Sequence, residues 1–203
     1  LPGLKLLPPT NDSTDLTLDV WAAATEGANG DVAVSGPQQI VVDIGVVAPS
    51  VSGSGQGLED EWIALDLSAS VNAEIGNETL SVHIEDLPAH AVLRLRDSGT
   101  ILTPDTDGRY DVTAHLDNLE IRWDWNSPQR HSDEDISFNL RAVVTDTDGD
   151  SNQTLAPVTV EVNAVADAPT LAVDDAAGVE NEWIALEIDS ALVDTDGSES
   201  LLV

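Results

Sequence analysis

The sequence predicts an all-β fold made of β-sandwich repeats in tandem. Three observations predict it. Apolar and polar residues alternate along many short segments, turn residues separate those segments, and one long pattern occurs twice. Alternation with a period of two places every second side chain on one face of a strand, as in a sheet that covers a core.

Two motifs recur about 120 residues apart. LEDEWIALDLSAS (58–70) returns as VENEWIALEIDSA (179–191), and VVDIGVVAPSV (41–51) returns as EVNAVADAPTL (161–171). A period of this length is a normal domain size. The sequence therefore predicts the C-terminal strands of a first repeat (1–48), a complete repeat (49–168) and the N-terminal strands of a third (169–203).

The complete repeat holds seven main alternating segments. In ISFNLRAVV, for example, Ile136 and Phe138 face one side while Ser137 and Asn139 face the other. Seven short strands in about 120 residues are typical of an immunoglobulin-like sandwich. The expected strands are 50–57, 62–68, 79–85, 91–96, 119–125, 136–145 and 154–165.

Smaller features fill the remaining positions of this repeat. Asp-Gly in PDTDGRY (104–110) predicts a type I′ hairpin turn, and 113–119 suits a single helical turn. Trp123 and Trp125 alternate with polar residues and are expected in the core. Trp62 lies opposite the apolar face of its strand, so it is expected to cover a neighbouring domain or to lie on the surface.

The composition excludes several classes of function. Asp and Glu total 38 against 7 Lys and Arg, a net charge of -31, so the chain is expected to bind neither nucleic acid nor an anionic membrane. Hydrophobic residues make up 41%, too many for a disordered acidic chain. Cysteine is absent, which excludes disulfides, thiolate catalysis and a cysteine-built zinc site. Methionine is absent too, and we interpret the chain as an internal piece of a larger protein.

Acidic residues gather at one predicted end of the complete repeat. Strands of a sandwich run from end to end, so the turn 58–62, the loop 129–135 and the second linker (163–169) share that end. The loop 193–199 of the third repeat faces back toward the same linker. Crowded carboxylates repel unless a cation neutralises them, and donors that are all oxygen favour calcium. The expected ligands are Glu59, Glu61, Asp133, Asp135, Asp167, Asp194 and Asp196.

The opposite end carries TDTDGD (145–150). It begins like an EF-hand loop, but position twelve is Pro157 rather than Glu, so it is not an EF-hand. A partial calcium site and a solvated turn both remain open for this loop. The candidate ligands there are Asp146, Asp148 and Asp150.

The first linker (44–49) has lost the matching acids. Val47, Ala73 and Ile75 stand where the second junction has Asp167, Asp194 and Asp196. Apolar side chains do not coordinate calcium. We therefore expect a calcium-poor first junction held by apolar contacts of Val46, Val47 and Ile75.

No catalytic pattern stands out, and the chain is expected not to be an enzyme. The sequence has no Ser-His-Asp order and no phosphate-binding loop, and its many acid pairs are individually uninformative. The four histidines, His83, His90, His115 and His131, show no metal-ligand spacing.

Four motifs together resemble the tandem cadherin-like or immunoglobulin-like repeats of large bacterial RTX-type adhesins. These motifs are EDEWIALDLSAS, SDEDISFNLRAVVTDTDGD, NAVADAPTL and ALVDTDGSESL, and the resemblance extends over nearly the whole chain. The resemblance implies calcium-stiffened extender domains that hold a ligand-binding tip away from the bacterial cell surface, outside the cell. The RTX nonapeptide itself is absent from these residues.

The expected function is therefore a calcium-dependent structural spacer. Its partners are expected to be neighbouring repeats of the same chain, with strand complementation between chains as a further expectation, because neither partial repeat can bury its apolar face alone. Two alternatives remain open. One is a glycan- or peptide-binding module of such an adhesin, and the other is a non-catalytic domain of a secreted or halophilic surface protein.

Overall fold

The computed structural model describes residues 3–71, 78–194 and 196–203. Within these residues every regular element is a β-strand, which confirms the all-β prediction. The described part of the chain has no helix that is long and apolar enough to cross a membrane. Contacts divide the chain into two compact units. The first comprises residues 1–50, 70–81 and 142–154, and the second comprises residues 51–69, 82–141 and 155–203.

Eight strands are linked in the order β8-β10-β6-β5-β12-β11-β7-β9. They are β5 (Ser50–Leu58), β6 (Ile63–Ser70), β7 (Thr79–Glu85), β8 (Ala91–Leu95), β9 (Tyr110–Asp111), β10 (Leu119–Trp123), β11 (Ile136–Thr145) and β12 (Ser151–Asn163). All seven expected strands are present, with ends shifted by a few residues, and β9 is additional.

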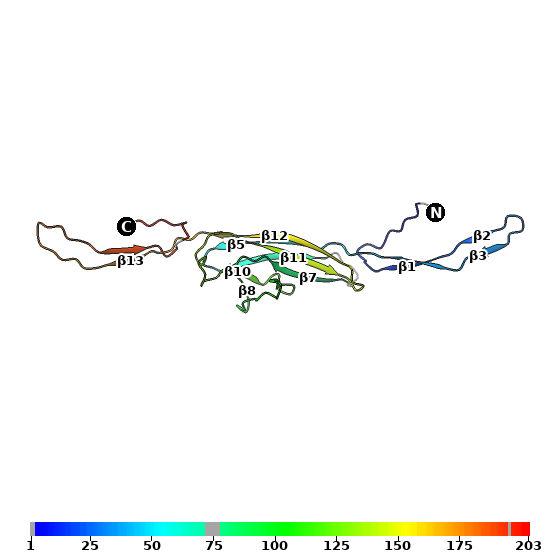
Figure 1. The fold of residues 1–203 in the computed structure, drawn as a ribbon, viewed down its shortest axis with the longest axis horizontal. Coiled ribbons are helices and arrows are strands. Elements are labelled where there is room, and N and C mark those ends of the chain that lie inside the picture. The colour runs from blue at the N-terminus through cyan, green and yellow to red at the C-terminus, as the bar shows by residue number, and fades with distance from the viewer. Residues whose placement is uncertain (1–2, 72–77, 195) are drawn as a thin grey trace. The chain divides into compact units, whose positions relative to one another are not determined.

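The first strand of this set joins two layers. Strand β5 lies between β6 and β12 and runs parallel to β12, with Val160 opposite Gly55 and Asn163 opposite Leu58 (Figure 1). Strands β6, β10 and β8 follow on one side as antiparallel neighbours, while β11, β7 and β9 follow β12 on the other. This is the strand order of an immunoglobulin-like or cadherin-like sandwich, and it confirms the predicted fold class.

The core of the second unit lies between the inner faces of these layers. Strand β6 alternates buried and exposed residues from Ile63 onward, and β11 does so from Ile136 to Leu140. Burying every second side chain on each sheet encloses an apolar layer and leaves the polar side chains in water. The larger buried residues here include Leu65, Ile84, Leu93, Leu119, Ile121, Ile136, Phe138, Leu140, Val158 and Val160.

Glycines replace apolar side chains along β5. A Cβ atom at Gly57 would lie 2.7 Å from Ile63 Cγ1, and one at Gly53 would lie 2.7 Å from Leu67 Cδ2. Strand β5 therefore packs directly against the side chains of β6. Gly178 and Ile184 reproduce the relationship of Gly57 and Ile63, since a Cβ at Gly178 would lie 2.5 Å from Ile184 Cγ1. The repeated sequence motif thus carries a repeated packing contact.

The flanking segments form two-stranded pairs. In the N-terminal segment, β1 (Leu16–Val20) pairs with β4 (Gln38–Val42), and β2 (Ala23–Thr25) pairs with β3 (Val32–Val34) (Figure 1). In the C-terminal segment, β13 (Thr170–Val173) pairs with β14 (Ile188–Ala191). Their apolar side chains are largely exposed, as two strands cannot enclose a core. The predicted division into one complete and two partial repeats remains a prediction.

Three smaller predictions for the complete repeat are wrong or partly wrong. Residues 113–118 lie in turns and a bend rather than in a helical turn, and β10 begins at Leu119. At 105–108, Gly108 has a positive φ of 80° but Asp107 does not, whereas a type I′ turn needs two such residues. Trp123 is buried as expected, but Trp125 is 46% exposed because β10 ends at Trp123 and the chain leaves the sheet.

Trp62 is covered by cations of its own domain. The guanidinium carbons of Arg94 and Arg122 lie 4.0 and 4.3 Å from the centre of its ring. Cations at this distance are attracted to the ring face. Trp62 therefore packs in an arginine–tryptophan cluster with Arg94 of β8 and Arg122 of β10.

Candidate metal centres

Three side chains from distant parts of the sequence form the first candidate metal centre, which we call the second-linker cluster: Glu59, Asp194 and Asp196. One carboxylate oxygen from each lies within 4.8 Å of the others. Glu59 directly follows β5, and the two aspartates follow β14. Because successive strands of a sandwich run in opposite directions, the sequence predicted that these segments meet at one end, and in the structure they do.

Glu59 is the most constrained member of this cluster. It is only 4% exposed, and its Oε1 accepts a hydrogen bond of 2.5 Å from the backbone N–H of Val165. Its Oε2 is shielded from solvent and has no hydrogen-bond partner. Burial raises the pKa of Glu59, and the negative charges of Asp194, Asp60 and Asp133 raise it further. An ionised Glu59 therefore needs a positive partner.

A tight turn fixes the two aspartates. Asp194 is 3% exposed; its Oδ1 accepts from the N–H of Asp196 at 3.0 Å and its Oδ2 from the hydroxyl of Ser198 at 3.0 Å. The N–H of Ser198 donates to Asp196 Oδ1 at 2.8 Å and is the main cause of the lowered pKa of Asp196. Gly197 has a φ of 103°, which L-residues rarely adopt. Sequence and backbone thus hold two carboxylates close together.

The other residues predicted for this end take different positions. Asp135 Oδ1 accepts from the N–H of Val162 at 3.1 Å and so fixes the end of β12. Asp133 is exposed, and its backbone N–H bonds Asp196. Glu61 is exposed as well. Among the described residues, none of these three belongs to a group of three close metal-ligating side chains.

Asp167 joins a second group, the His131 cluster, with Asp60 and His131. His131 Nδ1 lies 2.8 Å from Asp60 Oδ1 and 3.1 Å from Asp167 Oδ2. His131 is 8% exposed, and the ring of Trp125 meets it edge-on with the centroids 5.4 Å apart. Sequence spacing did not reveal this group, since His131 and Asp60 are 71 residues apart.

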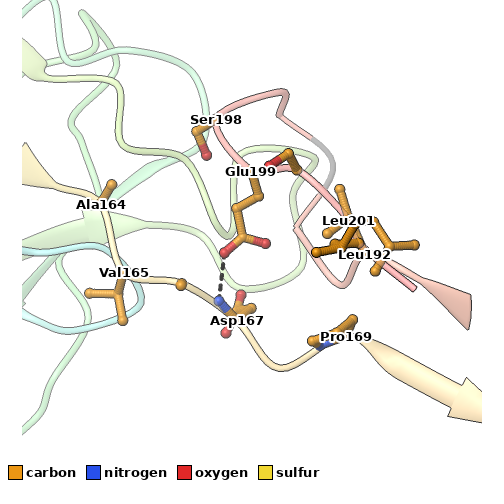
Figure 2. Close-up of a pocket in the computed structure, with 11 residues that line it drawn as sticks. Ala164, Val165, Asp167, Pro169, Leu192, Ser198, Glu199 and Leu201 are labelled. Atoms are coloured by element: carbon orange, nitrogen blue, oxygen red, sulfur yellow. Dashed lines mark hydrogen bonds between the residues drawn. The ribbon is translucent and has the colours of Figure 1, made fainter.

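An open cavity of about 500 Å³ adjoins Asp167. Figure 2 shows its wall, with the Glu199 side chain directed at the linker, where Glu199 Oε1 accepts from the N–H of Asp167 at 2.6 Å. Apolar side chains including Val165, Pro169 and Leu201 complete the lining. The contact ties the segment after β14 to the second linker.

The third group lies in the first compact unit and comprises Asp146, Asp148 and Asp150, each with one oxygen within 4.8 Å of the others. Asp146 is 8% exposed. Its Oδ1 accepts from the N–H groups of Gly149 and Asp150 at 3.1 and 2.9 Å, whereas Oδ2 has no hydrogen-bond partner. A hydrogen bond with Asp146 raises the pKa of Asp148.

Two further acids approach this third group and were missed in the sequence. The charge of Asp43 is the main cause of the raised pKa of Asp150, and Asp15 adds to it. Asp15 Oδ1 also accepts from the N–H of Ile44 at 2.9 Å. The sequence repeat could have predicted these two acids, because the 120-residue period matches Asp15 with Asp135 and Asp43 with Asn163.

The apolar contacts expected at the first linker are found only in part. Val46 is buried, but Val47 is 65% exposed, so the expectation is wrong for Val47. Val47 points to solvent while Asn152 Nδ2 binds the carbonyl of Val46 at 3.1 Å. Ala73 and Ile75 lie outside the described residues.

Comparison with known proteins gives no assignment by sequence. No protein-family model matches the chain. No match to a curated protein is found either.

Solved structures with a similar arrangement include human CDH23 EC21–23 at 12% identity, with a TM-score of 0.37, 86% of this chain and 55% of that one covered. Mouse protocadherin-24 EC1–3 has 15% identity and a TM-score of 0.32, with 73% and 45% covered. The Enterococcus faecalis MSCRAMM ACE has 9% identity and a TM-score of 0.33, with 77% and 62% covered. The chain thus spans about half the length of these structures. TM-scores below 0.5 do not establish a common fold, so the fold assignment rests on the strand order.

Proposed function

We propose that the chain is a calcium-stiffened structural spacer, or extender, of a large bacterial cell-surface adhesin. The observation that carries this proposal is the second-linker cluster of Glu59, Asp194 and Asp196. Glu59 is buried with one oxygen unpaired, beside two further carboxylates. Three negative charges in such a position are costly unless a cation binds them.

Calcium fits the donors of this cluster best. Calcium takes six to eight oxygen ligands in an adaptable geometry, whereas magnesium requires a stricter octahedron and keeps more water. The cluster offers carboxylate oxygens alone. Calcium here fixes the turn after β5 to the turn after β14.

A second calcium ion is proposed at Asp146, Asp148 and Asp150. Asp146 Oδ2 is the unpaired buried oxygen. A hydrogen bond with Asp146 raises the pKa of Asp148, and the charge of Asp43 raises the pKa of Asp150, so several carboxylates crowd together at this loop. Asp43 supplies a further acid beside Asp150. Of the two alternatives left open for this loop, the proposal takes the partial calcium site rather than the solvated turn.

The spacer role follows from what such ions do to the chain. The site at Glu59, Asp194 and Asp196 joins segments that are far apart in sequence, and the site at Asp146, Asp148 and Asp150 has Asp43 of a distant segment beside it. Metal bonds that lock successive segments together stiffen a tandem array, while an array without them bends at its linkers. The proposed partners are accordingly neighbouring repeats of the same chain at the cell surface, with strand complementation between chains as a further proposal.

Thermal melting with and without a chelator, at low ionic strength, tests this function. Calcium should raise the melting temperature, and equimolar magnesium should raise it much less. A third arm in concentrated sodium chloride after chelation distinguishes a halophilic surface protein, which would keep its stability there. A melting temperature that ignores both calcium and chelator contradicts the proposed function.

A further inference from the structure

The His131 cluster differs from the other two groups in its chemistry. It contributes one imidazole nitrogen and two carboxylates, His131 with Asp60 and Asp167, whereas the other two groups contain carboxylates alone. Imidazole suits zinc and its first-row neighbours, while calcium prefers oxygen. The segments that supply the three ligands are the turn after β5, the loop before β11 and the second linker.

The hydrogen bonds of this cluster do not satisfy all of its carboxylate oxygens. A neutral imidazole has at most one proton on Nδ1, and the hydrogen bond from that nitrogen goes to Asp60 Oδ2 at 3.0 Å. Asp60 Oδ1 and Asp167 Oδ2 are shielded from solvent and have no hydrogen-bond partner. Both lie near the same nitrogen, at 2.8 and 3.1 Å. Two carboxylate oxygens therefore meet at one point with a single proton between them.

The spacing of these atoms suits a small tetrahedral ion. Ligand atoms around zinc at bond lengths of about 2.0 to 2.1 Å lie about 3.3 Å apart. The observed separations of 2.8 and 3.1 Å need to widen by only about half an ångström or less. When Nδ1 binds the metal, the proton of the neutral ring moves to Nε2, so the ligand set remains one neutral nitrogen and two carboxylates.

Neighbouring residues hold the three ligands in place, and a cavity gives an ion access to them. The edge-on contact with Trp125 restricts the His131 ring, and Asp60 occupies a turn with a φ of 65°. Asp167 lines the cavity of about 500 Å³, through which an ion and a water ligand can enter. We propose that Asp60, His131 and Asp167 form a zinc site with a fourth position open to water, separate from the calcium sites.

Titration of the metal-stripped chain with Zn²⁺, in the presence of excess Ca²⁺, tests this proposal. We expect one zinc ion per chain that calcium does not displace, and Co²⁺ in its place should show the intense visible absorption of a tetrahedral site. His131→Asn and Asp60→Asn should each weaken zinc binding at least about tenfold. Asn adopts positive φ readily, so the backbone at residue 60 tolerates the second variant.

The matched control is His90→Asn, since His90 is exposed, has a φ of 75° and belongs to no close metal-ligating group among the described residues. It should bind zinc like the parent chain. Calcium-dependent melting of each variant confirms that it folds. Three results would each overturn the zinc site: a parent chain that binds no zinc, cluster variants that bind zinc as tightly as the parent, or zinc that calcium displaces. The group would then be an ordinary histidine–aspartate ion pair.

Discussion

The Glu59 carboxylate is bonded to the second linker through Val165, whose backbone N–H donates to Oε1 at 2.5 Å. This contact places a buried glutamate beside Asp194 and Asp196 and leaves its other oxygen unpaired. The position of Glu59 thus depends on the linker, and its charge depends on what binds there.

Glu59→Gln should have opposite effects with and without calcium. The pKa of Glu59 is raised in the folded chain above the ordinary value of 4.5. Protonation of Glu59 therefore stabilises the fold below about pH 4.5, and this stabilisation is lost as the pH rises through the folded pKa. Without metal at pH 7, the glutamine variant should be more stable than the parent chain. Urea unfolding measured between pH 4 and pH 8 reports this difference.

With saturating calcium the order should reverse. The variant loses a charged ligand, and a tenfold weaker affinity corresponds to about 1.4 kcal/mol of binding free energy. Glu61→Gln, at an exposed glutamate outside the cluster, is the matched control and should behave like the parent. If Glu59→Gln were less stable than the parent in both conditions, Glu59 would be a structural hydrogen-bond acceptor only.

Arg141→Met should destabilise the chain by about 3 kcal/mol, because it leaves Glu85 buried with one partner fewer. Arg141 forms two bonds to Glu85, from Nε to Oε1 at 2.7 Å and from Nη2 to Oε2 at 2.9 Å, and Arg109 Nε adds a third at 3.0 Å. Chemical denaturation measures the loss. Arg96→Met, at an exposed arginine, should change the unfolding free energy little.

The same pair predicts a dependence on acid. Hydrogen bonding to Arg141 is the main cause of the lowered pKa of Glu85. The stability that this ion pair contributes is therefore present above about pH 4.5 and is lost as the pH falls through the folded pKa. In Arg141→Met the loss of stability on acidification should be smaller than in the parent. An unchanged acid profile would show that Arg109 alone sets the ionisation of Glu85.

Gly57→Ala should cost about 1 to 3 kcal/mol, since its Cβ would lie 2.7 Å from Ile63 Cγ1. The control Ser54→Ala lies on the exposed face of the same strand and should be nearly neutral. Combining Gly57→Ala with Ile63→Val should recover part of the loss, because the shorter side chain relieves the contact. A neutral Gly57→Ala would show that β5 lies farther from β6 than described.

The strands were predictable because their signals are local. Ile136 to Leu140 alternate within five residues, and turn residues mark the ends of the neighbouring strands. The meeting of Glu59 with Asp194 was also predictable. The alternating direction of successive strands and the 120-residue period together place both residues at the same end of the complete repeat. The same period matches Asp15 with Asp135 and Asp43 with Asn163, so the presence of these two acids near the third group was also predictable.

Other features depend on distances that the sequence does not encode locally. His131 meets Asp60 across 71 residues, and no spacing rule for metal ligands covers such a pair. Trp125 continues the alternation of β10 but lies beyond its end, where sheet geometry no longer places it in the core. Val47 is apolar yet exposed, because linker backbone rather than a sheet face sets its direction.

The central claim is that calcium binds at Glu59, Asp194 and Asp196, and calorimetric titration of the metal-stripped chain with Ca²⁺ tests it most directly. The parent chain is compared with Asp194→Asn and with the control Asp174→Asn, which alters an exposed aspartate of the same segment. Binding at a hundredfold excess over Kd would stabilise the fold by about 2.7 kcal/mol. The account predicts that Asp194→Asn loses one calcium site and that Asp174→Asn keeps it. Identical calcium titrations for all three proteins, or no binding by any of them, would contradict it.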